Sequence, residues 1–235
     1  YLADPDVVDV PLAGLIDPDY LADRAKLISM DETMGTASAG RPDGSASFAP
    51  DRSWEFPSTT HLVAVDIAGN VANMTASIEQ GFGAHIMVDG YLLNNELTDF
   101  SFEPTRDGAP VANACGPNKR PRSSMSPTLV FDEAGAFFMA IGSPGGSRII
   151  QYVAKTLVYV LDLKMNIQAA IAAPHIVNRN GVTELELNQD QVEKTGVLAK
   201  ALRALGHEVV IRQQNSGLHG VVRKSYGLEG GADPR

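Results

Sequence analysis

The feature that most constrains the fold of this chain is an abrupt change of character at Thr59. Residues 33–58 are mostly Gly, Ala, Ser, Pro and charged residues, a composition typical of a linker. The residues that follow alternate around Val63 and Val65, and this alternation predicts a β-strand. A linker that runs directly into a strand indicates a domain junction. On this interpretation, Thr59 is simply the first residue of the strand.

Thr59 also has a second interpretation. If the chain is cut between Ser58 and Thr59, Thr59 carries a hydroxyl and a free α-amine on the same residue. Such an amine can act as the base for a weak hydroxyl nucleophile, so that no separate His is needed. The residues around the junction leave both interpretations open.

The composition sets limits on the class of protein. A chain of 235 residues is long enough for one large domain or two small ones with a sizeable core. Its 19 basic and 28 acidic residues give a net charge of −9, and the absence of a Lys/Arg cluster argues against nucleic-acid binding. The five His residues lack the spacing of metal ligands, so we expect neither metal nor cofactor. Cys115 excludes an intrachain disulfide because it is the only cysteine, and we interpret it as a small packing residue.

The N-terminal part predicts a short helical tail followed by the linker. Residues 1–32 form the tail, with a helix start at Asp17-Pro18-Asp19. The positions expected to be buried in this helix are Tyr20, Leu21, Ala25 and Leu27. After the linker, turn residues at 66–70 separate two apolar segments, so residues 60–78 predict a β-hairpin.

The rest of the chain predicts an α+β fold. Apolar periodicity indicates three helices, over residues 149–161, 167–173 and 189–205. In the last of them, Val192, Leu198, Leu202 and Leu205 share one face, and Gly206 suits the C′ position. We expect strands at 84–88, 128–131, 136–141, 183–187 and 208–211, and a hairpin over 217–231. Strands, then helices, then strands favour α+β layers over a doubly wound parallel sheet.

Three polar segments contain residues suited to ligand binding. Glu96 and Asp99 can hold an ammonium group through charge-assisted hydrogen bonds, or they lie in a solvated loop. The adjacent hydroxyls of Ser123 and Ser124 can bind a carboxylate, or they cap the strand that follows. Gly145-Gly146, at the start of a helix, can present N–H groups to an oxyanion, or it forms a tight turn.

Taken together, the motifs resemble the small subunit of the γ-glutamyltransferases (glutathione hydrolases), in the order and at roughly the spacing of that family. The resemblance extends from about residue 59 to the end of the chain, and residues 1–58 resemble the tail of the family's large subunit. The matching segments are Tyr1-Leu2-Ala3-Asp4-Pro5-Asp6, Thr59-Thr60-His61, Leu92-Leu93-Asn94-Asn95, Gly116-Pro117-Asn118-Lys119-Arg120-Pro121, Ser123-Ser124-Met125-Ser126-Pro127, Gly142-Ser143-Pro144-Gly145-Gly146-Ser147-Arg148 and Gly231-Ala232-Asp233-Pro234-Arg235.

The resemblance implies a fold and a mechanism. The family has the αββα sandwich of the N-terminal-nucleophile hydrolases, built from both subunits of a self-cleaving precursor. Carried over, cleavage at Ser58-Thr59 frees Thr59 as the nucleophile, and Ser77 is its hydroxyl partner. The remaining roles fall to Gly145 and Gly146 as oxyanion donors, Ser123 and Ser124 as the carboxylate site, and Glu79, Glu96 and Asp99 as the ammonium site.

The chain departs from the family pattern in its ammonium site. Glu79 stands where well-known members have Asn, Glu96 stands where the family has Gln or Glu, and Ser77 replaces the usual Thr. Three carboxylates exceed the charge of one ammonium, so one Glu is protonated, Glu79 turns away, or the ligand differs from glutamate. The family also uses an Arg of its large subunit, which lies outside this sequence.

The resemblance further implies partners. The large subunit of the same precursor completes a heterodimer, γ-glutamyl compounds such as glutathione are substrates, and amino acids or peptides are acceptors. The family pattern suggests a periplasmic or extracellular location, although the sequence itself indicates no compartment. Two alternatives remain: an acylase for a cephalosporin, glutaryl-type or poly-γ-glutamate amide, or a non-catalytic homologue that binds γ-glutamyl peptides.

Overall fold

The computed structural model describes residues 1–53 and 58–235. The N-terminal tail contains helices α1 (Leu12–Leu15) and α2 (Pro18–Ala25). The predicted helix start is confirmed, because the Asp17 carboxylate accepts a hydrogen bond from the Tyr20 N–H at 2.8 Å and Pro18 opens the helix. The predicted burial is wrong for Leu21 and Ala25, whose face of the helix meets solvent, and for Leu27, which is exposed in the turn after the helix ends.

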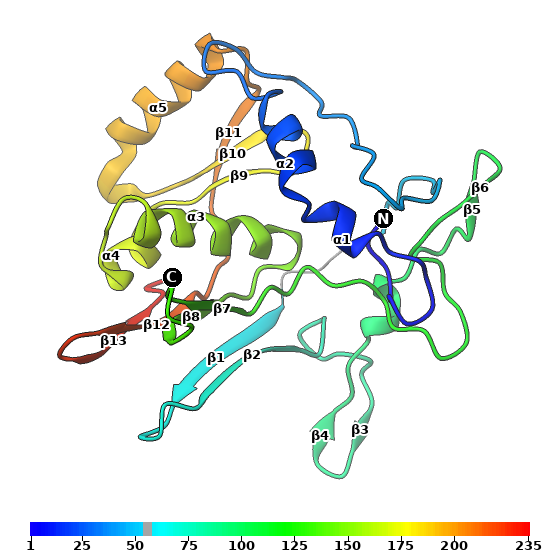
Figure 1. Cartoon of the computed structure of the whole chain (residues 1–235), viewed down its shortest axis with the longest axis horizontal. Helices are drawn as coiled ribbons and strands as arrows, with labels where there is room; N and C mark the ends of the chain where they lie inside the picture. Colours follow the sequence, from blue (N-terminus) through cyan, green and yellow to red (C-terminus); the bar gives the residue numbers. More distant parts are fainter. Residues whose placement is uncertain (54–57) are drawn as a thin grey trace.

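The described part of the linker runs over the surface of the rest of the chain (Figure 1). The Thr33 N–H donates to the Leu205 carbonyl at 2.7 Å, and further along Ala37 exchanges hydrogen bonds with Asn180. Residues 54–57 of the predicted linker lie outside the described residues. Its role as a flexible pre-cleavage segment stays a prediction.

A four-stranded antiparallel sheet forms the centre of the molecule. Its strands are β7 (Thr128–Phe131), β8 (Phe137–Gly142), β12 (His219–Lys224) and β13 (Gly227–Ala232), in the order β13-β12-β8-β7. Helices α3 (Ile149–Leu161) and α4 (Ile167–Ala172) lie on one face of this sheet (Figure 1). The predicted strands, helices and C-terminal hairpin in this region are therefore confirmed.

The main core fills the space between this sheet and its two helices. Residues at helical spacing on α3 meet the alternate residues of β8 that point toward them, as the periodicity predicted. Burying each large aliphatic side chain here stabilises the fold by about 1.5–3 kcal/mol. The buried residues of this core are Met139, Ile141, Ile149, Tyr152, Val153, Val160, Ile167, Ala170, Ile171, Val177, Leu218 and Val222.

The predicted N-terminal hairpin is also confirmed, and it contacts the central sheet at β8 and β12. It consists of β1 (Thr59–Val65) and β2 (Val71–Ser77). His61 is buried where the two layers meet, with its Nδ1 2.8 Å from the Thr75 hydroxyl. The ring lies so close to Gly142 that a Cβ there would stand 2.2 Å from the His61 Cε1. The hairpin can approach β8 this closely because residue 142 has no side chain.

A second, smaller sheet contains β9 (Ile176–Asn178), β10 (Thr183–Glu186) and β11 (Val209–Arg212), and β9 contacts α3. Helix α5 (Val192–Ala204), preceded by η3 (Gln189–Gln191), connects β10 to the parallel strand β11. The predicted helix face is wrong for Val192 and Leu198, which are exposed. It is confirmed for Leu202, which packs against the small core of this sheet. Thr195 and Ala199 are the buried residues of the helix. The parallel crossover between β10 and β11 determines which side of α5 faces these two strands. As predicted, Gly206 follows the end of the helix, with a φ of +90°.

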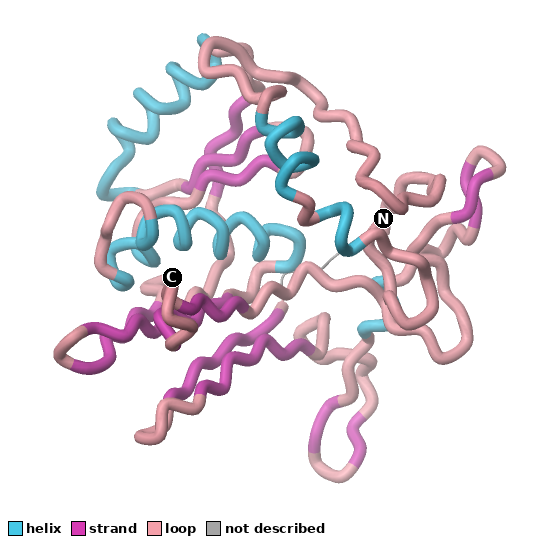
Figure 2. Tube along the Cα trace, in the orientation of Figure 1, coloured by secondary structure: helices cyan, strands magenta, loops and turns pink. Residues whose placement is uncertain are grey.

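The region between β2 and β7 is mostly loop with short strand pairs (Figure 2). It contains β3 (Met87–Val88), β4 (Tyr91–Leu92), η1 (Glu96–Asp99), β5 (Thr105–Arg106) and β6 (Ala109–Pro110). The strand predicted from residue 84 is wrong for its first half, because Gly83 and His85 adopt positive φ angles of 51° and 58° and turn the chain. Cys115 is exposed rather than a packing residue, since it follows a turn closed by the Ala114 N–H.

Replacing Gly142 with Ala is expected to destabilise the chain. The added methyl group would overlap the His61 ring and force the hairpin away from β8, at a cost of about 1–3 kcal/mol. The matched control is Gly230→Ala in β13, where an added Cβ meets no atom within 4 Å. Urea unfolding of both variants tests the close contact, and equal midpoints would contradict it.

The buried His61 is expected to make stability depend on pH. Burial lowers the pKa of His61 to about 4, and the neighbouring Asn73 offsets this shift only in part. The unfolded chain takes up the proton first, so this stability is complete above about pH 6.5 and is lost as the pH falls toward 4. At about 1.4 kcal/mol per pKa unit, the loss approaches 3 kcal/mol.

The measurement is the free energy of unfolding at pH 7 and pH 5 for the wild type and for His61→Gln. The variant should lose clearly less stability between the two pH values. The control His85→Asn removes an exposed His that has no effect on the pKa of His61, and it should follow the wild type. An identical pH dependence for His61→Gln and the wild type would count against a neutral, buried His61.

Candidate active site

The site begins at the open end of the N-terminal hairpin. The register of β1 and β2 places Thr59 opposite Ser77, so their side chains share one face of the hairpin. The Thr59 hydroxyl donates to the Ser77 Oγ at 3.3 Å, and the Ser77 hydroxyl donates to the Ser58 carbonyl oxygen at 2.6 Å. The Glu79 N–H also donates to the Ser77 Oγ, at 2.8 Å. The single donor and both lone pairs of Ser77 are thereby used, which fixes the hydroxyl between Ser58 and Thr59.

An acidic wall stands next to these hydroxyls. Glu79 and Asp99 are buried, and Glu96 is half-buried at the start of η1. Asn95 joins the two segments: its Nδ2 donates to the Glu79 Oε2 at 3.1 Å, and its Oδ1 accepts from the Gln80 N–H at 3.0 Å. Glu79 has φ +74°, a strained conformation for a residue with a side chain, and Asn95 helps to hold it.

The acidic wall favours protonation of Glu96. Burial is the largest effect and raises the pKa of Glu96. The neighbouring Ser77 offsets this in part, the charge of the Glu79 carboxylate adds to it, and Asp99 offsets it slightly. A carboxyl group that is buried beside a like charge holds its proton to a higher pH. The wall can therefore carry less negative charge than its three carboxyl groups suggest.

Two other segments complete the site. Ser123 is exposed and Ser124 half-buried in the stretch that leads into β7. Gly145 and Gly146 are buried at the start of η2 (Gly146–Arg148), directly before α3, with φ angles of 136° and 57°. A Cβ on Gly145 would lie 2.6 Å from the Tyr152 ring. Only glycine meets both the backbone and the space requirement there.

These segments converge on one narrow pocket of about 20 Å³. All the residues predicted from the sequence line it except Gly145, which is the neighbour of a lining residue, and Ser58, which bonds to Ser77. In this uncut form the pocket has room for about one water molecule. The lining residues are Thr59, Ser77, Glu79, Glu96, Asp99, Ser123, Ser124, Met125, Gly146 and Ile149.

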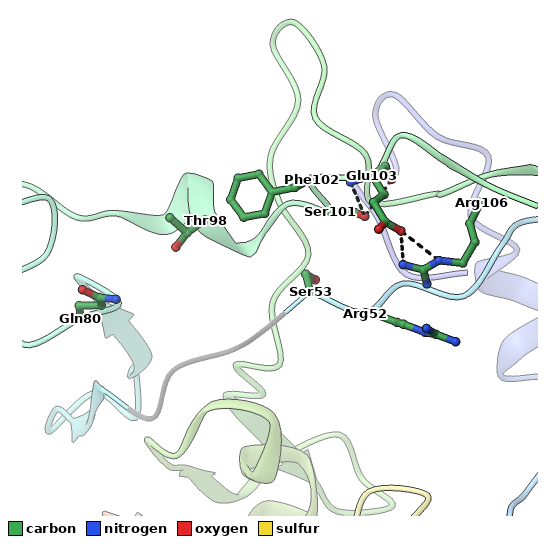
Figure 3. A pocket seen from close by; sticks show the side chains of 8 residues that line it. All are labelled: Arg52, Ser53, Gln80, Thr98, Ser101, Phe102, Glu103 and Arg106. Atoms are coloured by element: carbon green, nitrogen blue, oxygen red, sulfur yellow. Dashed lines mark hydrogen bonds and ion pairs between the residues drawn. The ribbon is translucent and has the colours of Figure 1, made fainter.

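Sequence reasoning missed several contributors to the site. Met125 and Ile149 add apolar surface to the pocket. In the sequence, Met125 is an apolar residue after Ser124 and Ile149 is the first residue of α3, so both positions predict only packing. Asn95 belongs to the motif Leu92-Leu93-Asn94-Asn95, but nothing in the sequence predicts its hydrogen bond to Glu79. A larger hollow of about 600 Å³ lies nearby, between Ser53 and residues 98–106 (Figure 3), and shares no lining residue with the pocket.

The chain is similar to proteins of known family and structure. The model of the family described as Gamma-glutamyltranspeptidase matches residues 1–235. The chain belongs to the γ-glutamyltranspeptidase family. A curated relative, the glutathione hydrolase proenzyme of Bacillus subtilis (strain 168), is 40% identical over 220 residues, which cover 88% of this chain and 35% of the relative. The chain thus spans about a third of the length of that relative.

Two further similarities fit this family assignment. The acylase ACY 1 proenzyme of Pseudomonas sp. (strain SE83) is 34% identical over 210 residues, which cover 88% of this chain and 34% of the relative. A mutant γ-glutamyltranspeptidase of Helicobacter pylori has a TM-score of 0.63 at 34% identity, covering 74% of this chain and 98% of that one. The predicted N-terminal-nucleophile hydrolase fold is therefore confirmed, and this chain provides the C-terminal part of it.

The roles assigned to individual pocket residues stay predictions, because the family similarity does not test them one by one. Among residues 1–53 and 58–235, no group of three or more His, Cys, Asp or Glu side chains could hold a metal ion. Within the same residues, no helix is long and apolar enough to span a membrane.

Replacing Glu79 with Gln is expected to lower the pKa of Glu96. The substitution removes the repulsive charge and keeps an oxygen that can accept from Asn95. The pKa of Glu96 should move down toward its ordinary value, and ¹³C NMR of the side-chain carboxyl groups measures the titration midpoint. Glu103→Gln, an exposed change of the same kind, is the control. An unchanged or higher Glu96 midpoint in Glu79→Gln would contradict the coupling.

Proposed function

We propose that this chain is the catalytic part of an enzyme that transfers and hydrolyses γ-glutamyl groups, through an ester on Thr59 that forms after the chain cleaves itself. The observation that carries the proposal is the hydrogen-bonded series from Thr59 through Ser77 to the Ser58 carbonyl. It supports the proposal because the Thr59 hydroxyl and a donor to the Ser58 carbonyl oxygen lie at one peptide bond. A hydrogen bond to this oxygen stabilises the negative charge that develops there during attack.

In the proposed self-cleavage, the Thr59 Oγ attacks the Ser58 carbonyl carbon. A carbon–oxygen bond forms, the Ser58–Thr59 carbon–nitrogen bond breaks, and the nitrogen takes the proton lost from the hydroxyl. The product is an ester with a free Thr59 α-amine. Water then hydrolyses the ester to leave a Ser58 carboxylate and the Thr59 hydroxyl. The narrow pocket of the uncut form would exclude substrate until this step.

In the proposed turnover, the freed α-amine of Thr59 is the general base. Its reference pKa of about 7.7–8.0 suits proton transfer near neutral pH. The hydroxyl attacks the γ-glutamyl amide, the N–H groups of Gly145 and Gly146 stabilise the oxyanion, and the amine of the leaving group takes the proton. Water or the amine of an amino acid or peptide then resolves the Thr59 ester, which gives hydrolysis or transpeptidation.

The proposed substrate position follows from charge. The acidic wall would bind the α-ammonium of the glutamyl group, and the hydroxyls of Ser123 and Ser124 would bind its α-carboxylate. The raised pKa of Glu96 favours its neutral form, and a neutral Glu96 would leave two negative charges to face one ammonium. It is one of the three arrangements that the excess of carboxylates allows.

A second candidate function is that of a related amide acylase, and similarity to the acylase ACY 1 proenzyme favours it. A glutaryl-type acyl group has no ammonium, so it would leave the acidic wall without a cationic partner. The retained Glu79, Glu96 and Asp99 therefore favour a γ-glutamyl substrate. A non-catalytic homologue that binds γ-glutamyl peptides would have no need of the Thr59–Ser77–Ser58 series.

The proposed partner is the remainder of the same precursor, since the relatives are proenzymes about three times as long as this chain. The outer face of the N-terminal hairpin is available to it, because Leu62 and Met74 there are 42% and 51% exposed. After cleavage, Asp4 would keep the two pieces together, because its buried carboxylate accepts from the Arg120 guanidinium at 2.6 Å. The proposal includes a periplasmic or extracellular location, and the pattern of the family is its only support.

The test is the intact mass of the full precursor after expression. The wild type should give two pieces, the smaller beginning at Thr59, whereas Thr59→Ala should stay uncut because it lacks the nucleophile. Ser77→Ala should cleave about 10²–10³ times more slowly, since it loses the donor to the Ser58 carbonyl.

Thr59→Ser is the matched control because it keeps a hydroxyl, and it should still be cut. The cleaved proteins are then assayed on a γ-glutamyl anilide and on a glutaryl anilide. A folded wild type that stays uncut, or cleavage in Thr59→Ala, would overturn the proposed mechanism. Preference for the glutaryl substrate would favour the acylase.

A further inference from the structure

The pre-cleavage segment is attached to the rest of the protein at residues 49–53. Ala49 forms a β-bridge with Val111, and its N–H donates to the Pro110 carbonyl at 2.8 Å. The Arg106 guanidinium donates to the Pro50 carbonyl at 2.6 Å. Arg106 is itself oriented by the Glu103 carboxylate, as the dashed lines in Figure 3 show.

The strongest attachment is the side chain of Asp51. Its Oδ2 accepts from the Arg122 Nε at 2.7 Å and from the Asn113 Nδ2 at 2.9 Å. The Ser53 hydroxyl and N–H donate to the same carboxylate, and the Arg122 Nη2 donates back to the Ser53 Oγ at 2.9 Å. Burial alone would raise the pKa of Asp51, but the bonds from Arg122, Ser53 and Asn113 hold it below its ordinary value.

The residues that bind the Asp51 carboxylate also contact the candidate active site. Asn113 is fully buried, and its Nδ2 also donates to the Asp99 carbonyl at 2.7 Å. Its Oδ1 accepts from the Arg122 N–H at 2.9 Å, directly before Ser123. Asn113 therefore joins the Asp51 carboxylate to both the acidic wall and the serine segment of the pocket.

We propose that Arg122 and Asn113 form a carboxylate-docking site for Asp51, which positions the pre-cleavage segment so that the Ser58 carbonyl meets Ser77 and Thr59. The proposal rests on the proposed self-cleavage. The chain between Ser53 and Ser58 can span no more than about 18 Å. Ser58 is held beside the hairpin by its bond to Thr59, so an anchor at residues 51–53 limits the directions from which the chain can reach Ser58 and thereby the orientation of its carbonyl.

The inferred role is positioning rather than chemistry, because Asp51 touches none of the reacting atoms. Holding a reacting carbonyl near its nucleophile lowers the entropic cost of attack, and misplacement by about 1 Å can slow a reaction about 100-fold. A charge-assisted contact suits an anchor because it fixes the geometry of the segment as well as lowering its energy. Loss of the Asp51 charge should therefore slow cleavage without unfolding the protein.

The test is a time course of cleavage after cell-free synthesis of the full precursor. Asp51→Asn should be cut roughly 10-fold to 100-fold more slowly than the wild type, and Arg122→Leu should be slowed as well. The double variant should be no slower than the slower single variant, because both changes break the same contact. Asp23→Asn is the matched control, since it removes a carboxylate from the exposed ion pair with Lys26 and should be cut at the wild-type rate.

Folding is checked separately by the melting temperature of each variant in the Thr59→Ala background, which should match that of Thr59→Ala alone. Cleavage of Asp51→Asn at the wild-type rate would overturn the inference and leave the proposed function intact. Slow cleavage together with a fallen melting temperature would also overturn it, because the effect would then be a loss of folding. A folded wild type that is never cut would reject the proposed function itself.

Discussion

The geometry of the site depends on one hydroxyl group. Ser77 bonds to the Ser58 carbonyl, the Thr59 hydroxyl and the Glu79 N–H, so one side chain ties the ends of β1 and β2 to the start of the acidic wall. This arrangement requires the register in which Thr59 lies opposite Ser77, because a shift by one residue would turn one of them to the other face. The contact of His61 with β8 holds the hairpin in place, so the register and the packing support each other.

The pocket is shaped by residues with positive φ angles, and of these only Glu79 has a side chain and so carries a conformational cost. Glu79, Gly145 and Gly146 all have positive φ angles, and each belongs to a segment that presents groups to the pocket. The surrounding packing keeps these conformations in place: Asn95 holds Glu79, and the Tyr152 ring lies beneath Gly145. Strain of this kind persists only where neighbouring contacts over-determine it, and such places are commonly functional. A rigid sheet and core therefore position three otherwise irregular segments.

Much of the fold could be predicted because it rests on local periodicity. The hairpin, α3, α4 and the central strands follow from patterns of 2 and 3.6 residues, and the motif residues of the site follow from family resemblance. The errors occur where tertiary contacts decide. Periodicity shows that α5 is amphipathic, but the β10–β11 crossover selects Thr195 and Ala199 as its buried side. Leu21 is apolar and regularly spaced, yet nothing in its own sequence shows whether that face is covered.

Polar contacts between distant segments were the least predictable part of the site. Asn113 is surrounded in the sequence by small residues, and its partners at Asp51, Asp99 and Arg122 come from three different segments. A buried amide of this kind must satisfy its donors and acceptor, so its neighbours are constrained as strongly as it is. Through Asn113, the segment before Ser58 and two walls of the pocket share one hydrogen-bond network. The geometry of the pocket therefore depends on how this segment of the chain itself is held.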